Sequence, residues 1–251
     1  MCPQVSVVLT TFNRKELLKE TIDSILAQTF NDFELIVVDN FSDYDFFDHI
    51  SSFNDNRIRP YQNENAGIIA KNRNFGIGVS STNLIAFCDD DDLWETNKIQ
   101  MQFDILKAKG KSALICTGCS FVNGVRRPFL RDKLSEILFF ILSLNLVPAK
   151  YLLMAVSFIT NSSVLISKDI LANVGSVSEA AEKRSVEDFD LWLRISMDYD
   201  ICFIRAKLVR YRLHPDQVSN TTITKERSAE VIRSLWAKLN IVQKCIFYAF
   251  R

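Results

Sequence analysis

Short apolar runs and longer amphipathic stretches alternate along the first hundred residues. Three runs are short, apolar and bounded by polar residues, which predicts buried strands; they occupy residues 5–9, 33–38 and 84–88. A further strand, the third of four along the chain, is predicted over residues 58–61. Between and after them, helices are predicted over residues 17–26, 66–77 and 96–109. This alternating order predicts an α/β fold with a mostly parallel central sheet that is flanked by helices.

Polar residues follow three of the predicted strands. Residues 10–14 follow the first strand, Asp39 and Asn40 follow the second, and residues 89–92 follow the fourth. In parallel α/β sheets, ligands bind beyond the carboxyl ends of the strands. These residues are therefore the first candidates for a functional site.

The second half of the chain is less regular. Residues 134–147 and 151–159 are strongly apolar, but neither stretch reaches the ~20 apolar residues that a membrane span needs. Buried helices and an interfacial patch are the alternatives for them. Residues 225–251 have apolar residues at helical spacing and carry six Lys or Arg against two Asp or Glu. This composition favours peripheral contact with an anionic membrane; a helix packed on the domain or a homodimer face is the alternative.

Composition narrows the class of protein. With 251 residues, of which 48% are hydrophobic and 24% charged, the chain has the make-up of a packed globular protein. Lys and Arg number 30, as do Asp and Glu, and this balance argues against a nucleic-acid-binding protein. Residues 1–100 carry 16 acidic against 8 basic residues, which fits a metal-using site next to a surface that meets anions. Six cysteines without a regular framework, and no secretory signal, favour the cytoplasm.

The acidic run at residues 89–92 is the strongest chemical signal. Four adjacent carboxylates repel one another, and a divalent cation bound together with phosphate oxygens offsets this repulsion. Alternate side chains of an extended segment face the same way, so we expect Asp89 and Asp91 to address one ligand together. A solvated acidic turn that caps the next helix is the alternative.

Three other acidic or histidine positions carry weaker signals. Asp39 ends a predicted strand, where a carboxylate accepts hydrogen bonds from a ribose or base edge, or makes an Asx-turn. Glu187 and Asp188 begin an amphipathic segment, where acids serve as a general base or stabilise a helix N-terminus. His214 precedes a polar loop and is a metal or phosphate contact or a surface residue. No glycine-rich dinucleotide motif or P-loop occurs, which argues against nicotinamide-dependent and ATP-hydrolysing enzymes.

Taken together, these segments resemble family 2 of the glycosyltransferases, inverting enzymes that have the GT-A fold and use nucleotide-sugar donors. The matching stretches occur in the family's order and are VSVVLTTFNR (5–14), FELIVVDNFS (33–42), NENAGIIAKNRNFGI (63–77), LIAFCDDDDLW (84–94), SSVLISKDIL (162–171), VEDFDLWLR (186–194) and YRLHPDQVS (211–219). The resemblance implies one GT-A domain over residues 1–220, with a nucleotide-sugar half (1–112) and an acceptor half (113–220). Residues 221–251 would form an amphipathic, helical C-terminal extension.

The resemblance also implies roles for the matching residues. The uridine pocket would be lined by Thr10, Phe12, Arg14 and Asp39. Further donor contacts would be Arg73 near the diphosphate, with Asp89 and Asp90 at the nucleotide sugar. A Mn²⁺ or Mg²⁺ ion would be held by Asp91, Asp89 and His214. On the acceptor side, Asp188 would be the catalytic base, and the orienting residues would be Glu187, Asp92 and Trp94.

Two stretches depart from the family. The family's second strand usually ends in Asp-Asp-Gly-Ser, whereas this chain has Asp39-Asn40-Phe41-Ser42. This loop lacks one carboxylate and one glycine, which changes its expected nucleotide contacts. The apolar residues 134–154 match no general feature of the family.

The resemblance implies transfer of a hexose from a UDP-sugar to a hydroxyl of a lipid-linked oligosaccharide or lipopolysaccharide, with a β-glycoside as product. Galactose, glucose and N-acetylglucosamine are the candidate sugars, and O-antigen or outer-core assembly is the expected context. A metal-dependent nucleotidyltransferase is an alternative, but it favours a glycine-rich basic loop near the N-terminus, which TTFNR is not. A receiver-type signalling module is another, but such a module ends near ~120 residues and leaves the second half unexplained.

Overall fold

The computed structural model describes residues 2–109, 113–122, 149–155, 158–212, 222–242 and 244–245. The elements of the first half are β1 (Val5–Thr11), α1 (Lys15–Leu26), β2 (Phe33–Asp39), α2 (Phe46–Ser51), β3 (Ile58–Gln62), α3 (Ile69–Val79), β4 (Leu84–Asp89), β5 (Leu93–Trp94) and α4 (Lys98–Lys109). Those of the second half are β6 (Ala113–Val122), α6 (Ala149–Ala155), η1 (Asn161–Ser163), β7 (Leu165–Ser167), α7 (Lys168–Val174), η2 (Ala181–Lys183), α8 (Glu187–Asp198), β8 (Asp200–Arg212), α9 (Thr222–Ser234) and η4 (Trp236–Lys238).

The predicted strands and helices of the first half are all present, within a few residues of the expected ends. The helix predicted over 66–77 begins later, at Ile69. Ala66 and Gly67 precede it with φ angles of 51° and 77°. A left-handed backbone cannot continue into a right-handed helix, so the chain turns there and α3 starts after the turn.

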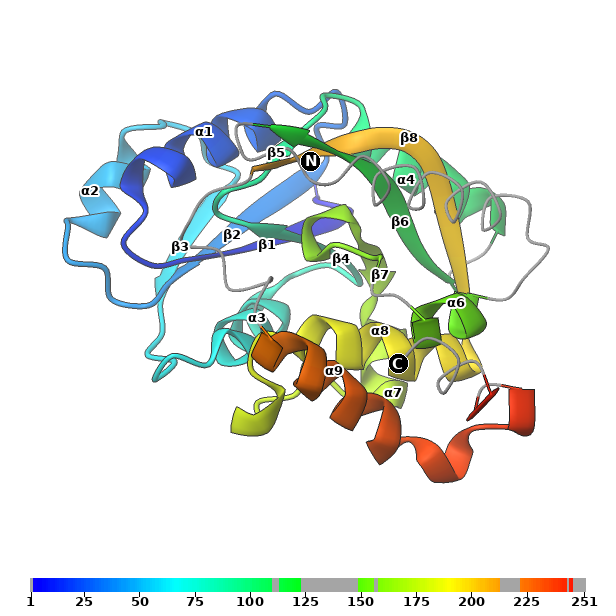
Figure 1. The fold of residues 1–251 in the computed structure, drawn as a ribbon. Coiled ribbons are helices and arrows are strands. Elements are labelled where there is room, and N and C mark those ends of the chain that lie inside the picture. The colour runs from blue at the N-terminus through cyan, green and yellow to red at the C-terminus, as the bar shows by residue number, and fades with distance from the viewer. Residues whose placement is uncertain are drawn as a thin grey trace.

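The described strands form one sheet in the order β3-β2-β1-β4-β7-β6-β8-β5. The first four of these are parallel, β7 runs antiparallel to both of its neighbours, β6 and β8 are parallel to each other, and β5 pairs antiparallel with β8. Parallel pairings are the majority, and helices cover the sheet (Figure 1). The predicted α/β architecture is therefore confirmed.

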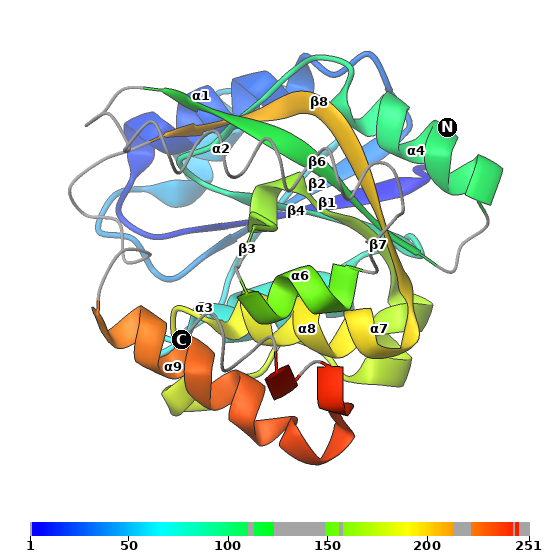
Figure 2. The same ribbon diagram turned by 45° about the vertical axis from the view of Figure 1, so that its right-hand side comes forward.

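Two hydrophobic cores lie on opposite faces of the sheet. Alternate residues of β1 serve the two faces, so Val7 and Leu9 pack with α1, α2 and α4, whereas Val8 packs with α3, α7 and α8. Figure 1 shows these helix layers above and below the sheet, and Figure 2 shows α9 outside α8. Because helices pack on both faces of the sheet, a site has to form at its edges or in its loops.

The C-terminal segment packs on the domain through part of its apolar side. Val231 and Ile232 of α9 and Leu239 beyond it are at most 4% exposed and join the core that contains α8. This finding supports the packed-helix alternative for these side chains. Ile241 and Val242, further along, are 74% and 52% exposed.

The apolar stretches of the second half are described only in part. Residues 134–147 lie outside the described residues, whereas α6 covers part of the second stretch, and its Leu153 is 1% exposed in the core. That part is a helix in which Leu153 is buried, whereas Tyr151 and Leu152 are partly exposed. Within the described ranges, no helix has both the length and the apolar character to cross a membrane.

Candidate active site

The carboxyl ends of β1, β2 and β4 meet at one edge of the sheet. In the strand register, Thr11 lies opposite Asp39 of β2, and Thr10 lies opposite Asp89 of β4. The three polar segments that the sequence analysis selected are therefore brought together, as the parallel topology requires.

Asp39 is held within the loop that follows β2. Its carboxylate is completely buried and accepts hydrogen bonds from the backbone N–H of Ser42 (2.9 Å), from Ser42 Oγ (2.5 Å) and from Gln62 Nε2 (3.0 Å). These bonds fix the path of residues 39–42. The turn-forming alternative for Asp39 is thus present, and any ligand contact would have to use the remaining acceptor positions of this carboxylate.

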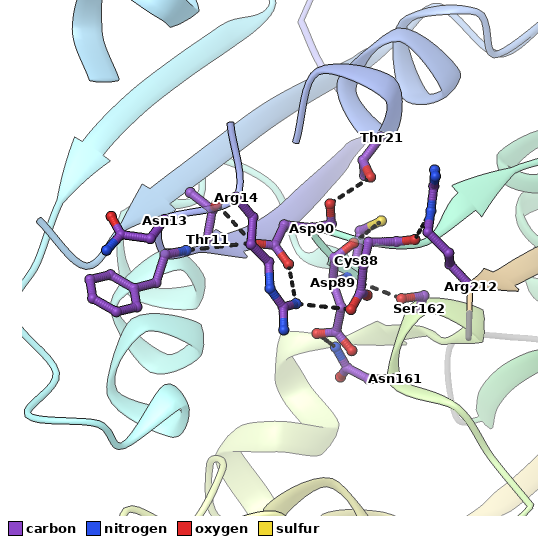
Figure 3. A network of polar contacts seen from close by, with 12 residues as sticks. Thr11, Asn13, Arg14, Thr21, Cys88, Asp89, Asp90, Asn161, Ser162 and Arg212 are labelled. Carbon is purple, nitrogen blue, oxygen red and sulfur yellow. Dashed lines mark hydrogen bonds and ion pairs between the residues drawn. The ribbon is translucent and has the colours of Figure 1, made fainter. Parts of the chain in front are cut away.

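Asp90 anchors the acidic loop to the loop after β1 (Figure 3). Its carboxylate is 5% exposed and accepts hydrogen bonds from Thr11 Oγ1 (2.8 Å) and Arg14 Nη1 (2.9 Å), while its carbonyl accepts one from Thr21 Oγ1 (2.9 Å). Burial raises the pKa of Asp90 to about 6, although Arg14 opposes this shift. Arg14 also donates to Asp91 (2.9 Å) and so offsets part of the repulsion in the loop. Asp90 therefore anchors the acidic loop, and the donor contact expected from the resemblance stays a prediction.

Arg73 of α3 connects the acidic loop to the first turn of α8. Its guanidinium is nearly buried and donates from Nη2 to Asp89 Oδ1 (2.9 Å) and from Nη1 to Glu187 Oε1 (2.7 Å). Close packing of α3 on β1 places it there, because a Cβ at Gly76 would lie 2.5 Å from Val8 Cγ1. In this structure Arg73 therefore faces two carboxylates, where the resemblance placed it near a diphosphate.

Acidic residues begin α8, where the positive end of the helix dipole stabilises them. Asp190 is 1% exposed and forms ion pairs with Lys183 (2.7 Å) and Arg194 (2.9 Å). Phe189 and Trp192 are buried in the core on the inner side of the helix. These contacts hold the first turn of α8 in place at the edge of the site.

Asp188, in the same turn, is a carboxylate with few hydrogen-bond partners in the described part of the chain. It is partly buried, its Oδ1 accepts a hydrogen bond from the backbone N–H of Phe189 (2.7 Å), and no side chain among the described residues donates to it. Burial and the neighbouring carboxylate of Glu187 raise the pKa of Asp188 to about 7, against the effect of Arg73. A carboxylate with a pKa near neutrality is suited to take a proton from a hydroxyl.

The acidic loop fits a metal ion that is held mainly by the phosphates of a substrate. Across the described ranges, no group of three or more His, Cys, Asp or Glu side chains is arranged to hold a metal by itself. Asp89 uses only Oδ1 for Arg73 and Asn161, and no described residue donates to its Oδ2. Mg²⁺ commonly takes one or two carboxylates, with phosphates and waters in its other positions. Asp89 and Asp91 are the carboxylates of this loop that would supply such contacts, whereas His214 lies outside the described residues.

Four other residues expected at the site lie at different depths. Phe12 is 50% exposed, and Thr10 is buried at the end of β1, where its Oγ1 has no hydrogen-bond partner among the described residues. Trp94 is 1% exposed, and Nζ of the buried Lys98 lies 3.6 Å from its ring centroid. Asp92 is completely buried, and burial raises its pKa well above its usual range. Trp94 and Asp92 are thus buried in this structure, and their expected role in orienting an acceptor stays a prediction.

Three residues of the site had no role assigned from the sequence. Asn161 donates to Asp89 Oδ1 (2.8 Å), and Ser162 Oγ accepts a hydrogen bond from the backbone N–H of Asp89 (3.0 Å). Arg212 of β8 donates to the carbonyl of Asp91 (3.1 Å) (Figure 3). The polar run at residues 160–163, between two apolar segments, is the signal that could have indicated the first two.

Comparison with known proteins agrees with this arrangement. The sequence matches Glycosyl transferase family 2 over residues 6–175. An uncharacterized glycosyltransferase of Rickettsia felis is 27% identical over 235 residues, which cover 93% of this chain and 38% of that protein. The Escherichia coli protein WfgD, named UDP-Glc:alpha-D-GlcNAc-diphosphoundecaprenol beta-1,3-glucosyltransferase, is 26% identical over 228 residues, which cover 86% of this chain and 79% of that protein. This chain thus spans well under half the length of the Rickettsia relative.

Solved structures share the fold. The crystal structure of S. aureus TarS 1–349 in complex with UDP-GlcNAc matches with a TM-score of 0.74 at 18% sequence identity, over 98% of this chain and 71% of that chain. This likeness confirms the GT-A fold that the resemblance implied.

Proposed function

The chain belongs to family 2 of the glycosyl transferases, and on this premise we propose that it transfers a hexose from a UDP-sugar to a hydroxyl of a lipid-linked or lipopolysaccharide acceptor, forming a β-glycoside. The name of the E. coli relative, with UDP-Glc as donor and a diphosphoundecaprenol-linked acceptor, supports this choice of substrates. The complex of TarS with UDP-GlcNAc supports a UDP-sugar donor. Glucose is therefore the first sugar to test, followed by N-acetylglucosamine and galactose.

The proposal rests mainly on the contacts of one residue, Arg73. The buried Arg73 joins Asp89 of the acidic loop to Glu187 of α8, which lies 114 positions after Arg73 in the chain. Asp188 follows Glu187 directly, so a carboxylate able to accept a proton stands at the same edge of the sheet as the acidic loop. A site that transfers a sugar needs both parts, because the donor's leaving group and the acceptor's hydroxyl react at one carbon.

The reaction that this arrangement supports is a single displacement. Asp188 takes the proton of the acceptor hydroxyl while the hydroxyl oxygen forms a bond to the anomeric carbon of the sugar. The bond between that carbon and the β-phosphate oxygen breaks, and its electron pair leaves with UDP. Attack from the face opposite to the leaving group inverts the configuration, so an α-linked donor gives a β-linked product.

Asp89 and Asp91 would hold a Mn²⁺ or Mg²⁺ ion together with the donor's diphosphate. When bound, this ion would neutralise the negative charge that develops on the leaving UDP. Arg73 and Asn161 keep Asp89 in place, and Arg14 does the same for Asp91. These three donors limit the freedom of the two carboxylates before any ligand arrives.

A donor panel tests the proposed function. Purified protein would be incubated with Mn²⁺, a synthetic GlcNAc-diphospho-lipid, and UDP-glucose, UDP-galactose or UDP-GlcNAc, and the release of UDP would be measured. We expect release with one of these donors that requires the lipid acceptor. Acceptor-dependent release with none of the three donors would contradict the proposal.

We expect kcat/KM to rise with pH through about 7. Asp188 accepts a proton only as the carboxylate, and its raised pKa of about 7 means that it is largely protonated below that pH and active above it. Rates would be measured from about pH 5.5 to about pH 9 at constant Mn²⁺. In Glu187→Gln the midpoint should move to lower pH, because a neighbouring negative charge is removed. A flat profile in the wild type across this range would contradict the assignment.

Peripheral contact with the cytoplasmic face of an anionic membrane forms part of the proposal. The apolar side chains of α9 that are buried in the domain cannot serve it, and in the described part of the C-terminal segment the exposed Ile241 and Val242 are the candidates. Lys238, also exposed, lies three residues before them. Two apolar side chains beside a basic residue have the composition of a shallow contact with anionic lipid.

Replacing Ile241 and Val242 by Asp should weaken binding to vesicles that contain anionic lipid by about tenfold or more, because apolar burial is lost and two negative charges are added. Cosedimentation with such vesicles measures this, and neutral vesicles provide the control. The melting temperature should stay unchanged, since both side chains are exposed. Equal binding by the variant and the wild type would rule out this contact.

A further inference from the structure

Phe41 lies at the edge of the site in an unusual state. It follows β2 and Asn40, its side chain is 56% exposed, and its φ angle is 58°. A bulky side chain is rarely found with a left-handed backbone, where glycine is the favoured residue. Phe41 therefore combines an unfavourable backbone with an apolar ring in solvent.

Both neighbours of Phe41 are fixed. The backbone N–H of Asn40 donates to the carbonyl of Thr11 (3.0 Å), and the backbone N–H and Oγ of Ser42 donate to the buried carboxylate of Asp39 (2.9 and 2.5 Å). These contacts define the backbone on each side of Phe41. The left-handed conformation is thus imposed by the loop, which holds the residue at the edge of the site.

A second set of bonds places Phe41 beside the loop after β1. The backbone N–H of Asn13 donates to Ser42 Oγ (2.8 Å), and the backbone N–H of Asp43 donates to Asn13 Oδ1 (2.8 Å). Phe12, which directly precedes Asn13, is itself 50% exposed. Two half-exposed phenylalanines therefore occupy adjacent loops that are bonded to each other.

The ring of Phe41 has no structural use within the described ranges. It belongs to neither hydrophobic core, and it makes no ring contact with another described aromatic residue. Strained residues of this kind occur preferentially at ligand-binding positions. The ring and its position both indicate a ligand with an apolar, flat surface.

We propose that Phe41 is a donor-binding residue whose ring packs against the base of the nucleotide, next to Phe12. This inference rests on the proposed UDP-sugar function and adds a residue to its donor site. The base is the part of a UDP-sugar with a planar π-face, and such faces stack on aromatic side chains. The sugar and the diphosphate are polar and charged, and the acidic loop with the cation that it would hold suits them better.

Titration calorimetry with UDP and Mn²⁺ on the full chain tests the proposal. In Phe41→Gly, the Kd for UDP should rise about tenfold, because the ring is lost. The melting temperature should stay the same or increase, since glycine adopts this backbone without strain. In Phe41→Tyr, which keeps the ring, the Kd should stay within about twofold of the wild type.

Asn54→Gly and Phe47→Ala are matched controls. Asn54 has a φ of 49° and so tests the relief of backbone strain alone, and Phe47 is a 50% exposed phenylalanine that lines a cavity of about 700 Å³ between α2 and β3. Both should bind UDP as the wild type does. An unchanged Kd in Phe41→Gly, with normal UDP binding by the wild type, would overturn this proposal alone. Failure of the wild type to bind UDP would overturn the proposed function and this inference with it.

Discussion

Asp188→Asn is expected to lower kcat by a factor of about 10²–10⁴ and to leave the Kd for UDP unchanged. Asparagine has nearly the same size and keeps hydrogen-bonding capacity, but it cannot take a proton from a hydroxyl at neutral pH. Asp188 makes no ion pair in the described structure, so the fold should be retained. Turnover at saturating donor and acceptor, together with calorimetry on UDP, separates the chemical step from binding.

The same substitution elsewhere on α8 controls for the loss of a charge. Asp198, exposed at the far end of the helix, should tolerate replacement by Asn with full turnover. Glu187→Gln should reduce turnover less than Asp188→Asn, because a glutamine oxygen can still accept a hydrogen bond from Arg73. Near-normal turnover in Asp188→Asn with loss of turnover in Glu187→Gln would show that Glu187, and not Asp188, is the base. Near-normal turnover in both variants would show that neither of these carboxylates of α8 takes part in the reaction.

Asp91→Asn is expected to lower turnover at saturating donor by about 10²-fold or more, because one of the two carboxylates proposed to hold the cation is lost. Arg14 keeps its ion pair with Asp90, so the loop should remain anchored and the melting temperature should change little. Initial rates across a Mn²⁺ and Mg²⁺ titration measure the effect.

Removal of the cation from the wild type should have the same consequence as Asp91→Asn. Excess chelator should abolish turnover, and added Mn²⁺ or Mg²⁺ should restore it in the wild type only. Full activity in chelator, or an Asp91→Asn variant with the wild-type response to metal, would show that the acidic loop works without a cation.

Local sequence pattern was sufficient for the first half of the fold. Short apolar runs predict β1, β2 and β4 because each is buried on both faces, and polar residues then mark their carboxyl ends. The second half was less predictable because its pairings are tertiary. β7 has three residues, and β5 has two that pair with the end of the long strand β8. Such short strands have no periodicity to detect.

The site was predictable where a motif is contiguous, and not where partners are distant. The acidic loop and the acids of α8 stand out in the sequence, but the ion pair of Arg73 with Glu187 joins residues 114 positions apart. The burial of Trp94 likewise depends on packing around Lys98, which no local pattern reveals. The C-terminal helix could not be placed from its sequence either, because an apolar stripe on a helix fits a membrane surface or a protein core equally well. The burial of Ile232 in the structure shows that the stripe packs on the core.

The anomeric configuration of the product tests the central claim most directly. Purified protein would convert a UDP-sugar and a synthetic GlcNAc-diphospho-lipid in the presence of Mn²⁺, and the coupling constant of the new anomeric proton would be read by NMR. The account predicts a β-linked sugar from the α-linked donor, formed in step with UDP release and lost in Asp188→Asn. An α-linked product, or a β-linked product formed at the same rate by Asp188→Asn, would contradict a single displacement with Asp188 as its base.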